Sequence, residues 1–220
     1  MPTSVDAGRR APRRDAAENR ESLLAAAAGA LAEASDASLE AIARSAGLTR
    51  RAVYGHFANR DELVIALVDR GTRRLNRIAT GVHHPDAPVA LALLGARLWD
   101  AVEHVRLLAA MAVRDPYVDR VAAALAPVRA ELLAIVERGG RDGSLRGDVP
   151  PAVLARLIEQ SALAVLAEAG RPAAELAAGD ARRLVMLAVL GTAGLSWTEA
   201  GELIQTTTEL APEPAEATAP

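Results

Sequence analysis

The sequence has no cysteine, no lysine and very few aromatic residues. Without cysteine, the chain forms neither a disulfide framework nor a thiolate metal site. Two Trp, two Tyr and one Phe are its only aromatic side chains. Apolar residues nowhere alternate with polar ones over a useful stretch, as they do in half-buried strands. Together these absences exclude an all-β fold.

The sequence is rich in alanine. Of the 220 residues, 51% are hydrophobic, and 51 residues are alanine. Alanine has the highest helix propensity and buries little area, so this composition favours helices packed closely through small side chains. Glycine and proline stop signals divide the pattern into helices expected at about 16–33, 38–45, 49–56, 61–80, 88–102, 104–113, 116–138, 151–169 and 180–198. Within the seventh of these, Pro127 either kinks the helix or begins a new one.

Charge is distributed unevenly along the chain. Residues 1–77 hold 13 Arg and 10 acidic residues, whereas residues 78–220 hold 12 Arg and 18 acidic residues. A basic front on an acidic body suits a module that faces nucleic acid. The longest uncharged run, residues 184–198, has 15 residues, which is shorter than the roughly 18–20 that a membrane span requires. Acidic residues also interrupt the only stretch that looks like a signal peptide, so we expect a cytoplasmic, nucleoid-associated protein.

Residues 38–57, SLEAIARSAGLTRRAVYGHF, have the pattern of two short helices joined by a tight turn. Gly47 can take the positive φ of such a turn, and Thr49 can cap the second helix. The apolar side chains that form the inner faces of the two helices are Leu39, Ile42, Ala43, Ala52, Val53 and Phe57. The side chains left outward are Arg50, Arg51, Tyr54 and His56. These are donors for phosphate oxygens and base edges, which a recognition helix in the major groove requires.

The segment 48–63, LTRRAVYGHFANRDEL, resembles the recognition helix and following turn of the tetracycline-repressor-like (TetR) family of bacterial transcription regulators. Its Tyr-x-His-Phe sequence at 54–57 carries the resemblance, and residues 19–33 are similar in spacing to the family's first helix. The resemblance covers about residues 19–70. It implies an all-α fold, in which an N-terminal three-helix helix-turn-helix domain precedes a ligand-binding and dimerisation bundle of about six helices.

The family resemblance also implies roles for individual residues. Phosphate contacts are expected from Ser38, Tyr54, His56 and Arg60, and base contacts from Thr49, Arg50 and Arg51. The resemblance implies a homodimeric, sequence-specific transcription regulator that binds double-stranded DNA at a palindromic operator. The first expectation is a repressor, which an unknown small-molecule effector releases from the operator. The domains expected are a flexible basic arm (1–14), the helix-turn-helix domain (15–62), the ligand-binding and dimerisation domain (63–205) and a disordered acidic tail (206–220).

The last two long helices, about 151–169 and 180–198, are apolar nearly all round. A surface helix has one apolar stripe, so these helices are expected to be buried on several sides, with a second subunit covering part of them. The effector pocket is expected to have aliphatic walls, because aromatic residues are so few. Its candidate lining residues are Trp99, His104, Met111, Arg114 and Tyr117. Ordinary core positions remain the alternative for Trp99 and Met111.

Three departures from the family pattern keep a second function open. Gly55 stands where a large contacting side chain is common, Leu31 stands where an aromatic is common, and the link 34–37 is short. The alternative is a small-molecule-binding or interaction protein with weakened DNA binding. No nucleophile with a base and no phosphate-binding loop is recognisable, so no enzyme and no cofactor are expected. The histidines at 83, 84 and 104 lack the spacing of ligand pairs, so no metal site is expected.

Overall fold

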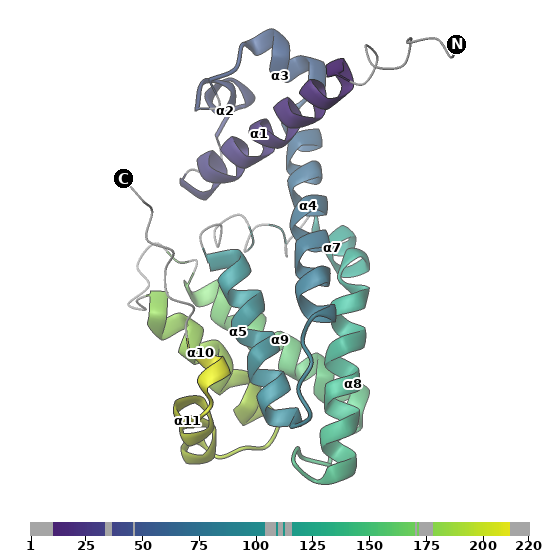
Figure 1. Cartoon of the computed structure of the whole chain (residues 1–220), viewed down its shortest axis with the longest axis vertical. Coiled ribbons are helices and arrows are strands. Elements are labelled where there is room, and N and C mark those ends of the chain that lie inside the picture. Colours follow the sequence, from purple (N-terminus) through teal and green to yellow (C-terminus); the bar gives the residue numbers. More distant parts are fainter. Residues whose placement is uncertain are drawn as a thin grey trace, which may run out of the picture. The chain divides into compact units, whose positions relative to one another are not determined.

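The computed structural model describes residues 11–33, 37–45, 47–103, 109, 112, 116–169, 171 and 178–211. Every regular element in this part of the chain is helical (Figure 1). The helices are α1 (Ala11–Glu33), α2 (Leu39–Ser45), α3 (Arg50–His56), α4 (Arg60–Thr80), α5 (Ala87–Val102), α7 (Val118–Ala124), α8 (Ala126–Asp142), α9 (Pro151–Ala169), α10 (Ala178–Thr192), α11 (Trp197–Thr206) and the short 3-10 helix η2 (Thr208–Leu210). The all-α fold predicted from the composition is confirmed.

Most helix boundaries lie close to their predicted positions. Helix α9 spans the predicted range, and α2 to α5 each begin within a residue of theirs. Helix α1 begins earlier, at Ala11 in place of residue 16, so residues 11–14 of the expected arm are helical. Residues 1–10 and most of the predicted helix 104–113 lie outside the described residues.

The pattern over 116–138 is two helices, not one. Helix α7 ends at Ala124, and α8 begins at Ala126, with Leu125 between them. Pro127 lies in the first turn of α8, where its missing N–H breaks no helical hydrogen bond. Of the two outcomes predicted for this proline, the start of a new helix is confirmed.

The single helix predicted over 180–198 is wrong at its C-terminal end. Helix α10 ends at Thr192, and Gly194 follows with a φ of +109°, a value that residues with a side chain rarely adopt. A new helix, α11, then begins with a capping box in which Ser196 accepts from the Glu199 N–H and the Glu199 carboxylate accepts from the Ser196 N–H. Both signals were present in the sequence, but the continuous apolar pattern concealed them.

The prediction of a disordered tail from residue 206 is also wrong for the first residues of that tail. Helix η2 follows α11, and Leu210 at its end is only 1% exposed. The guanidinium of Arg182 on α10 donates to the Leu210 carbonyl at 2.8 Å. Apolar burial and this hydrogen bond hold the segment against the helical core, although its composition is that of a tail. Residues 212–220 lie outside the described residues.

The described residues fall into two compact units. Unit 1 lies within Met1–Gly71 and Val105–Val121, and unit 2 within Thr72–His104 and Ala122–Pro220. The division passes through α4, whereas the sequence analysis placed a domain boundary at residue 62. The core of unit 1 is made by apolar residues of α1 to α4, which are Leu23, Leu24, Leu31, Ile42, Val53, Phe57, Leu63 and Val64.

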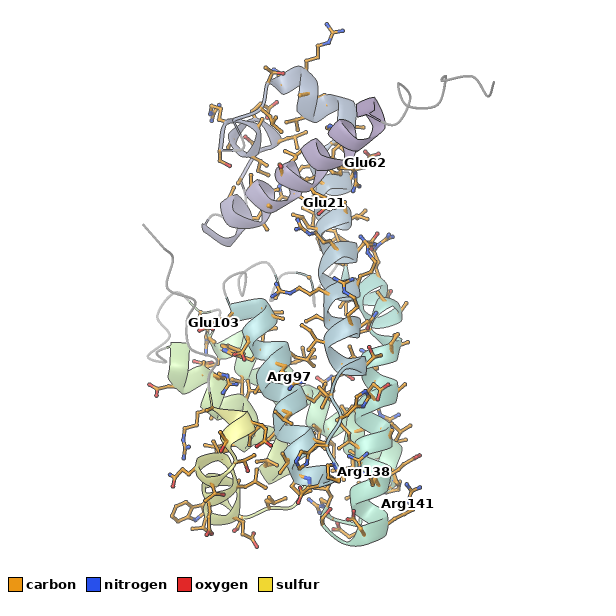
Figure 2. All side chains as sticks on the ribbon, in the orientation of Figure 1. Glu21, Glu62, Arg97, Glu103, Arg138 and Arg141 are labelled. Carbon is orange, nitrogen blue, oxygen red and sulfur yellow. The ribbon has the colours of Figure 1, made fainter. Side chains whose placement is uncertain are left out.

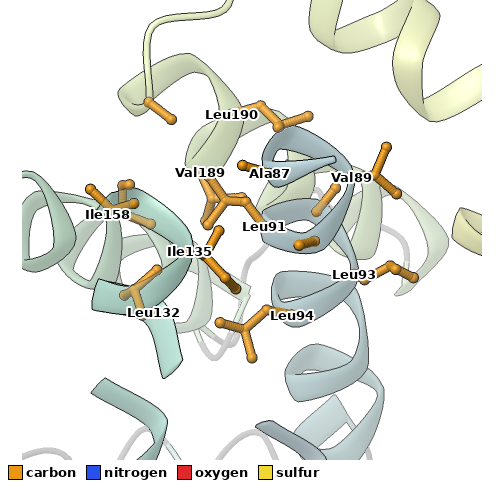
Figure 3. Close-up of a cluster of buried hydrophobic side chains, with 14 of the residues drawn as sticks. Ala87, Val89, Leu91, Leu93, Leu94, Leu132, Ile135, Ile158, Val189 and Leu190 are labelled. Atoms are coloured by element: carbon orange, nitrogen blue, oxygen red, sulfur yellow. The ribbon is translucent and has the colours of Figure 1, made fainter. Parts of the chain in front are cut away.

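Unit 2 is built around α5, which is buried along most of its length. Helix α5 packs on α8 and α10, and α9 packs on both of these helices. Five alanines of α5 are buried, in keeping with the alanine-rich composition, and their small side chains allow this close approach; they are Ala87, Ala90, Ala92, Ala96 and Ala101. Figure 3 shows larger side chains filling the space between these helices, among them Leu132, Ile158 and Val189.

Arg138 and Arg141 lie toward the C-terminal end of α8 (Figure 2). The Arg138 guanidinium donates to the carbonyl of His84 at 3.0 Å and so attaches the loop before α5 to α8. Among the described residues, no helix is long and apolar enough to cross a membrane.

Candidate nucleic-acid interface and internal cavity

The turn between α2 and α3 has the geometry that its sequence predicts. Gly47 has a φ of +65°, and its N–H donates to the Arg44 carbonyl at 3.1 Å. The hydroxyl of Thr49 accepts a hydrogen bond from the Ala52 N–H and caps α3. Val53 and Phe57 are buried beneath α3. These features fix which side of α3 faces the core, and so which side chains remain outward.

Arg50 and Tyr54, one turn apart on the outer side of α3, share an acidic partner on α2. The Tyr54 hydroxyl donates to Glu40 Oε1 at 2.9 Å, and Arg50 Nη2 lies 3.4 Å from the same oxygen. The Arg50 guanidinium also lies over the Tyr54 ring, 5.2 Å from its centroid. Tyr54 is nevertheless 41% exposed. Glu40 therefore orients both side chains while leaving them accessible.

Glu40 is negatively charged in this arrangement. The hydrogen bond from Tyr54, a backbone hydrogen bond and the nearby charges of Arg50 and Arg44 lower the pKa of its carboxyl below the usual value. A carboxylate beside two expected DNA contacts opposes a phosphate at the same place. Glu40 therefore already engages donors of Arg50 and Tyr54, two of the expected contact residues.

The remaining predicted contact residues lie around this pair. Arg51 is exposed on α3 and has no ion-pair partner within the described part of the chain, and His56 is half-buried at the end of the helix. Ser38 precedes α2, and its hydroxyl accepts from the Ala41 N–H at 3.2 Å. Arg60 begins α4 and donates from Nε to the carbonyl of Ala37 at 3.1 Å. Unit 1 thus contains all seven predicted DNA-contact residues, and each is placed by α2, α3 or the start of α4.

A second feature of interest is an apolar cavity of about 160 Å³ inside unit 2. Side chains of α5, α8, α9 and α10 form most of its wall, and Leu75 of α4 completes it. Apart from Trp99, Arg129 and Glu159, every lining residue is aliphatic or glycine. A cavity with the aliphatic walls predicted from the sequence is therefore present, although it is smaller than the roughly 300–1,000 Å³ usual for ligand pockets.

The predicted ligand-binding residues are only partly placed by the structure. Trp99 lines the cavity and is 3% exposed. Tyr117 is buried but belongs to unit 1 and does not line this cavity. His104, Met111 and Arg114 lie outside the described residues. Of the five, Trp99 is thus the residue that the structure brings to the cavity.

The few polar groups of the cavity wall differ in how they are paired. Arg129 donates from Nε and Nη2 to the carboxylate of Glu159, at distances of 2.6–2.9 Å, and from Nη1 to the Ala122 carbonyl. These hydrogen bonds to the Glu159 carboxylate raise the pKa of Arg129. The indole nitrogen of Trp99, in contrast, is buried and has no hydrogen-bond partner in the described structure. One donor of the wall is therefore unsatisfied.

Comparison with known proteins gives a family match for the N-terminal helices. Residues 23–67 match the model of bacterial regulatory proteins of the tetR family, a match that runs from α1 through α2 and α3 into α4. In this segment the chain is TetR-like. The match includes the turn at Gly47 and the outward residues of α3, so the family and the local geometry point to the same surface.

Solved structures agree with this family at the level of the fold. A TetR-family transcriptional regulator, PfmR from Thermus thermophilus, has a TM-score of 0.60 at 20% identity, covering 76% of this chain and 96% of its own. The regulator FadR from Bacillus subtilis, solved in complex with stearoyl-CoA, has a TM-score of 0.67 at 15% identity, covering 79% and 97%. The search of curated proteins gives no match. At these identities the likeness shows the fold alone.

The structure also shows functional candidates that the sequence pattern does not reveal. Glu40 is 14 residues from Tyr54 and on another helix, so no helical periodicity connects them. Arg129 and Glu159 are likewise 30 residues apart, and each taken alone is typical of a solvated helix face. Only the tertiary packing of α2 on α3, and of α8 on α9, brings these pairs together.

Proposed function

We propose that the TetR-like regulator is a homodimeric transcriptional repressor. Two copies of α3 enter successive major grooves of a palindromic operator, about 34–36 Å apart. A small molecule in the cavity of unit 2 favours a conformation that fits the operator poorly, and so releases the DNA. The observation that carries this proposal is the outer side of α3, where Arg50, Arg51 and Tyr54 are exposed on a capped helix after a tight turn.

The proposal assigns base contacts to Thr49, Arg50 and Arg51, and phosphate contacts to Ser38, Tyr54, His56 and Arg60. Fluorescence anisotropy of the purified protein, titrated across salt, tests it on DNA from upstream of its own gene, with random DNA of equal length as the control. Tighter binding to the upstream DNA, weakening steeply with salt, supports a sequence-specific regulator. Failure to bind any DNA at low salt would favour the alternative, a binding protein with weakened DNA affinity.

Replacing residues of α3 separates base contacts from phosphate contacts. Arg51→Ala is expected to weaken binding to the operator by about 1–3 kcal/mol per half-site and to relax one base preference, because an arginine reads guanine through two hydrogen bonds. Tyr54→Phe is expected to weaken binding to all sequences alike, because a phosphate contact carries no sequence information. Both effects are measured by anisotropy on the operator, on single-base variants and on random DNA.

The matched control for the α3 variants is Arg141→Ala, which removes an exposed arginine from α8 of unit 2. This substitution changes the net charge by the same amount as Arg51→Ala, but Arg141 lies outside the proposed DNA interface. If Arg141→Ala weakened operator binding as much as Arg51→Ala, the effect would be one of total charge, and the assignment of Arg51 to base contacts would be wrong.

Replacing Glu40 tests whether DNA competes with this carboxylate. Glu40→Gln is expected to tighten binding to random DNA several-fold, because it removes one negative charge per protomer and releases Arg50 and Tyr54 for phosphate. Since the pKa of Glu40 is lowered, its carboxylate is ionised at neutral pH. Glutamine resembles the protonated, uncharged carboxyl, which is not populated at that pH. The gain is expected to shrink as salt is added. Glu62→Gln, at the start of α4, is the control, and unchanged binding by Glu40→Gln would contradict the competition.

A further inference from the structure

The small volume of the cavity limits the size of any occupant. About 160 Å³ is close to a cavity of about 150 Å³ lined by aliphatic and aromatic residues that holds benzene. A single ring or a short aliphatic chain therefore fills this space, whereas a ligand as large as stearoyl-CoA, present in the structure of the Bacillus subtilis regulator, would extend outside it. The wall, from Leu91 and Leu94 on α5 to Val185 and Val189 on α10, is mainly apolar, so burying the apolar surface of a ligand against it is favourable.

The ion pair in the wall limits the charge of the occupant. Glu159 already occupies Nε and Nη2 of Arg129, and the Ala122 carbonyl occupies Nη1. Each charge of this pair is therefore already balanced by its partner, so a ligand carboxylate or amine gains a full ion pair only by displacing Glu159 or Arg129. Either exchange leaves a partly buried charge without its partner, which is unfavourable. The pair therefore disfavours ligands of either charge.

The unpaired indole N–H of Trp99 indicates which polar group a ligand needs, namely a hydrogen-bond acceptor. Trp99 lines the cavity, and its indole N–H is buried without an acceptor in the described structure. Such a donor loses its hydrogen bond to water on folding and gains nothing in return. A ligand oxygen or nitrogen that accepts this N–H restores the lost bond, and the indole offers no acceptor for a ligand donor.

We propose that the cavity binds a small uncharged molecule, with one ring or a short chain, whose single hydrogen-bond acceptor takes the N–H of Trp99. This inference rests on the proposed role of the cavity as the effector site and adds the chemical class of the effector. Trp99 is the anchoring residue, the aliphatic wall supplies the contact area, and the Arg129–Glu159 pair discriminates against charged analogues.

The two tryptophans of the chain make the test direct. Trp197 is 83% exposed at the start of α11, and Trp99 is buried in the cavity wall. In the full-length Trp197→Phe protein, Trp99 is the single indole, and its emission reports occupancy. Three probes of similar size are titrated: acetophenone, which has a carbonyl acceptor; ethylbenzene, its hydrocarbon counterpart; and benzoate, which is charged. Acetophenone is expected to shift the emission saturably and to bind about 3- to 10-fold more tightly than ethylbenzene, with benzoate weakest.

A second variant separates the hydrogen bond from the cavity itself. Trp99→Phe keeps an aromatic ring but removes the N–H, so the preference for acetophenone over ethylbenzene is expected to disappear while ethylbenzene still binds, as measured by calorimetry. Retained ethylbenzene binding shows that the cavity is intact. Ala162→Leu, which places a larger side chain in the wall on α9, is expected to abolish binding of all three probes without changing the circular dichroism spectrum.

Several results would overturn the inference. They are tighter binding of benzoate than of acetophenone, equal binding of acetophenone and ethylbenzene before Trp99 is replaced, binding of none of the probes, and saturable binding of stearoyl-CoA that acetophenone does not compete. Anisotropy on operator DNA is measured in parallel without any probe. Loss of probe binding with intact operator binding contradicts the ligand class alone, whereas probe binding that leaves operator affinity unchanged contradicts the proposed release mechanism alone.

Discussion

Leu157→Arg is expected to separate the proposed homodimer into monomers and to lower operator affinity by about 100-fold. Leu157 lies on α9 and is 48% exposed in the single chain, with Val153 one turn before it 36% exposed. The neighbouring side of the same helix buries Leu154 and Ile158. An apolar side of this kind is the surface proposed to pack on a second copy. In a two-fold interface the substitution places two unpaired charges in apolar surroundings, and each costs several kcal/mol.

The added charge has the wrong sign to weaken DNA binding by electrostatics. An extra arginine on each protomer raises the attraction to phosphate, so any loss of operator affinity comes from losing the second recognition helix. Sedimentation and anisotropy measure the two effects on the same sample. Ala130→Arg, at an exposed position of α8, is the matched control and is expected to leave the dimer intact. A Leu157→Arg protein that stayed dimeric would place the interface elsewhere.

The proposed DNA-binding surface was predictable from sequence because it depends on local rules. Gly47 at a left-handed turn position and Thr49 as a helix cap are determined by the backbone within a few residues. The apolar spacing of Val53 and Phe57 then fixes which side of α3 is buried, and hence that Arg51 and Tyr54 face outward. All of these predictions are confirmed as geometry, and the contacts with DNA remain proposals.

The cavity was predictable in character but not in its residues. Aliphatic walls follow from a composition with so few aromatics, and Trp99 is a candidate lining residue because large side chains are rare on these helices. Tyr117 is a candidate for the same reason, yet Tyr117 belongs to unit 1. Which side chains meet inside a bundle depends on how α5, α8, α9 and α10 rotate about their axes, and a nearly uniform apolar pattern does not fix that rotation.

The apolar pattern also gave no signal for the end of α10 or for the helical segment after α11. The pattern of 180–198 suggested one helix because small apolar residues continue through Ala193 and Leu195, and the backbone conformation of Gly194 is not visible in a periodicity. The segment after α11 appeared polar because threonine, glutamate and proline dominate it. Leu210 nevertheless packs this segment against the core, since burying a leucine side chain stabilises the folded state by about 1.5–3 kcal/mol.

Leu210→Ala is therefore expected to lower the free energy of unfolding by about 2–5 kcal/mol, as large-to-small substitutions in a packed core do. Leu210 is 1% exposed and belongs to the same cluster of buried residues as Leu93 and Leu190. Loss of its side chain leaves a void between η2 and α5, two elements that lie in contact. Urea unfolding followed by circular dichroism measures the change, with the slope of the transition checked for constancy.

Glu209→Ala provides the matched control for this prediction, because Glu209 is exposed and immediately precedes Leu210 in the same short helix. A surface substitution of this kind is expected to change stability by no more than about 0.5 kcal/mol. A disordered tail would make the two variants indistinguishable from the parent chain. A large loss with Leu210→Ala alone would show that η2 is an integral part of the unit 2 core, so that the chain closes its own bundle with a segment whose composition is that of a tail.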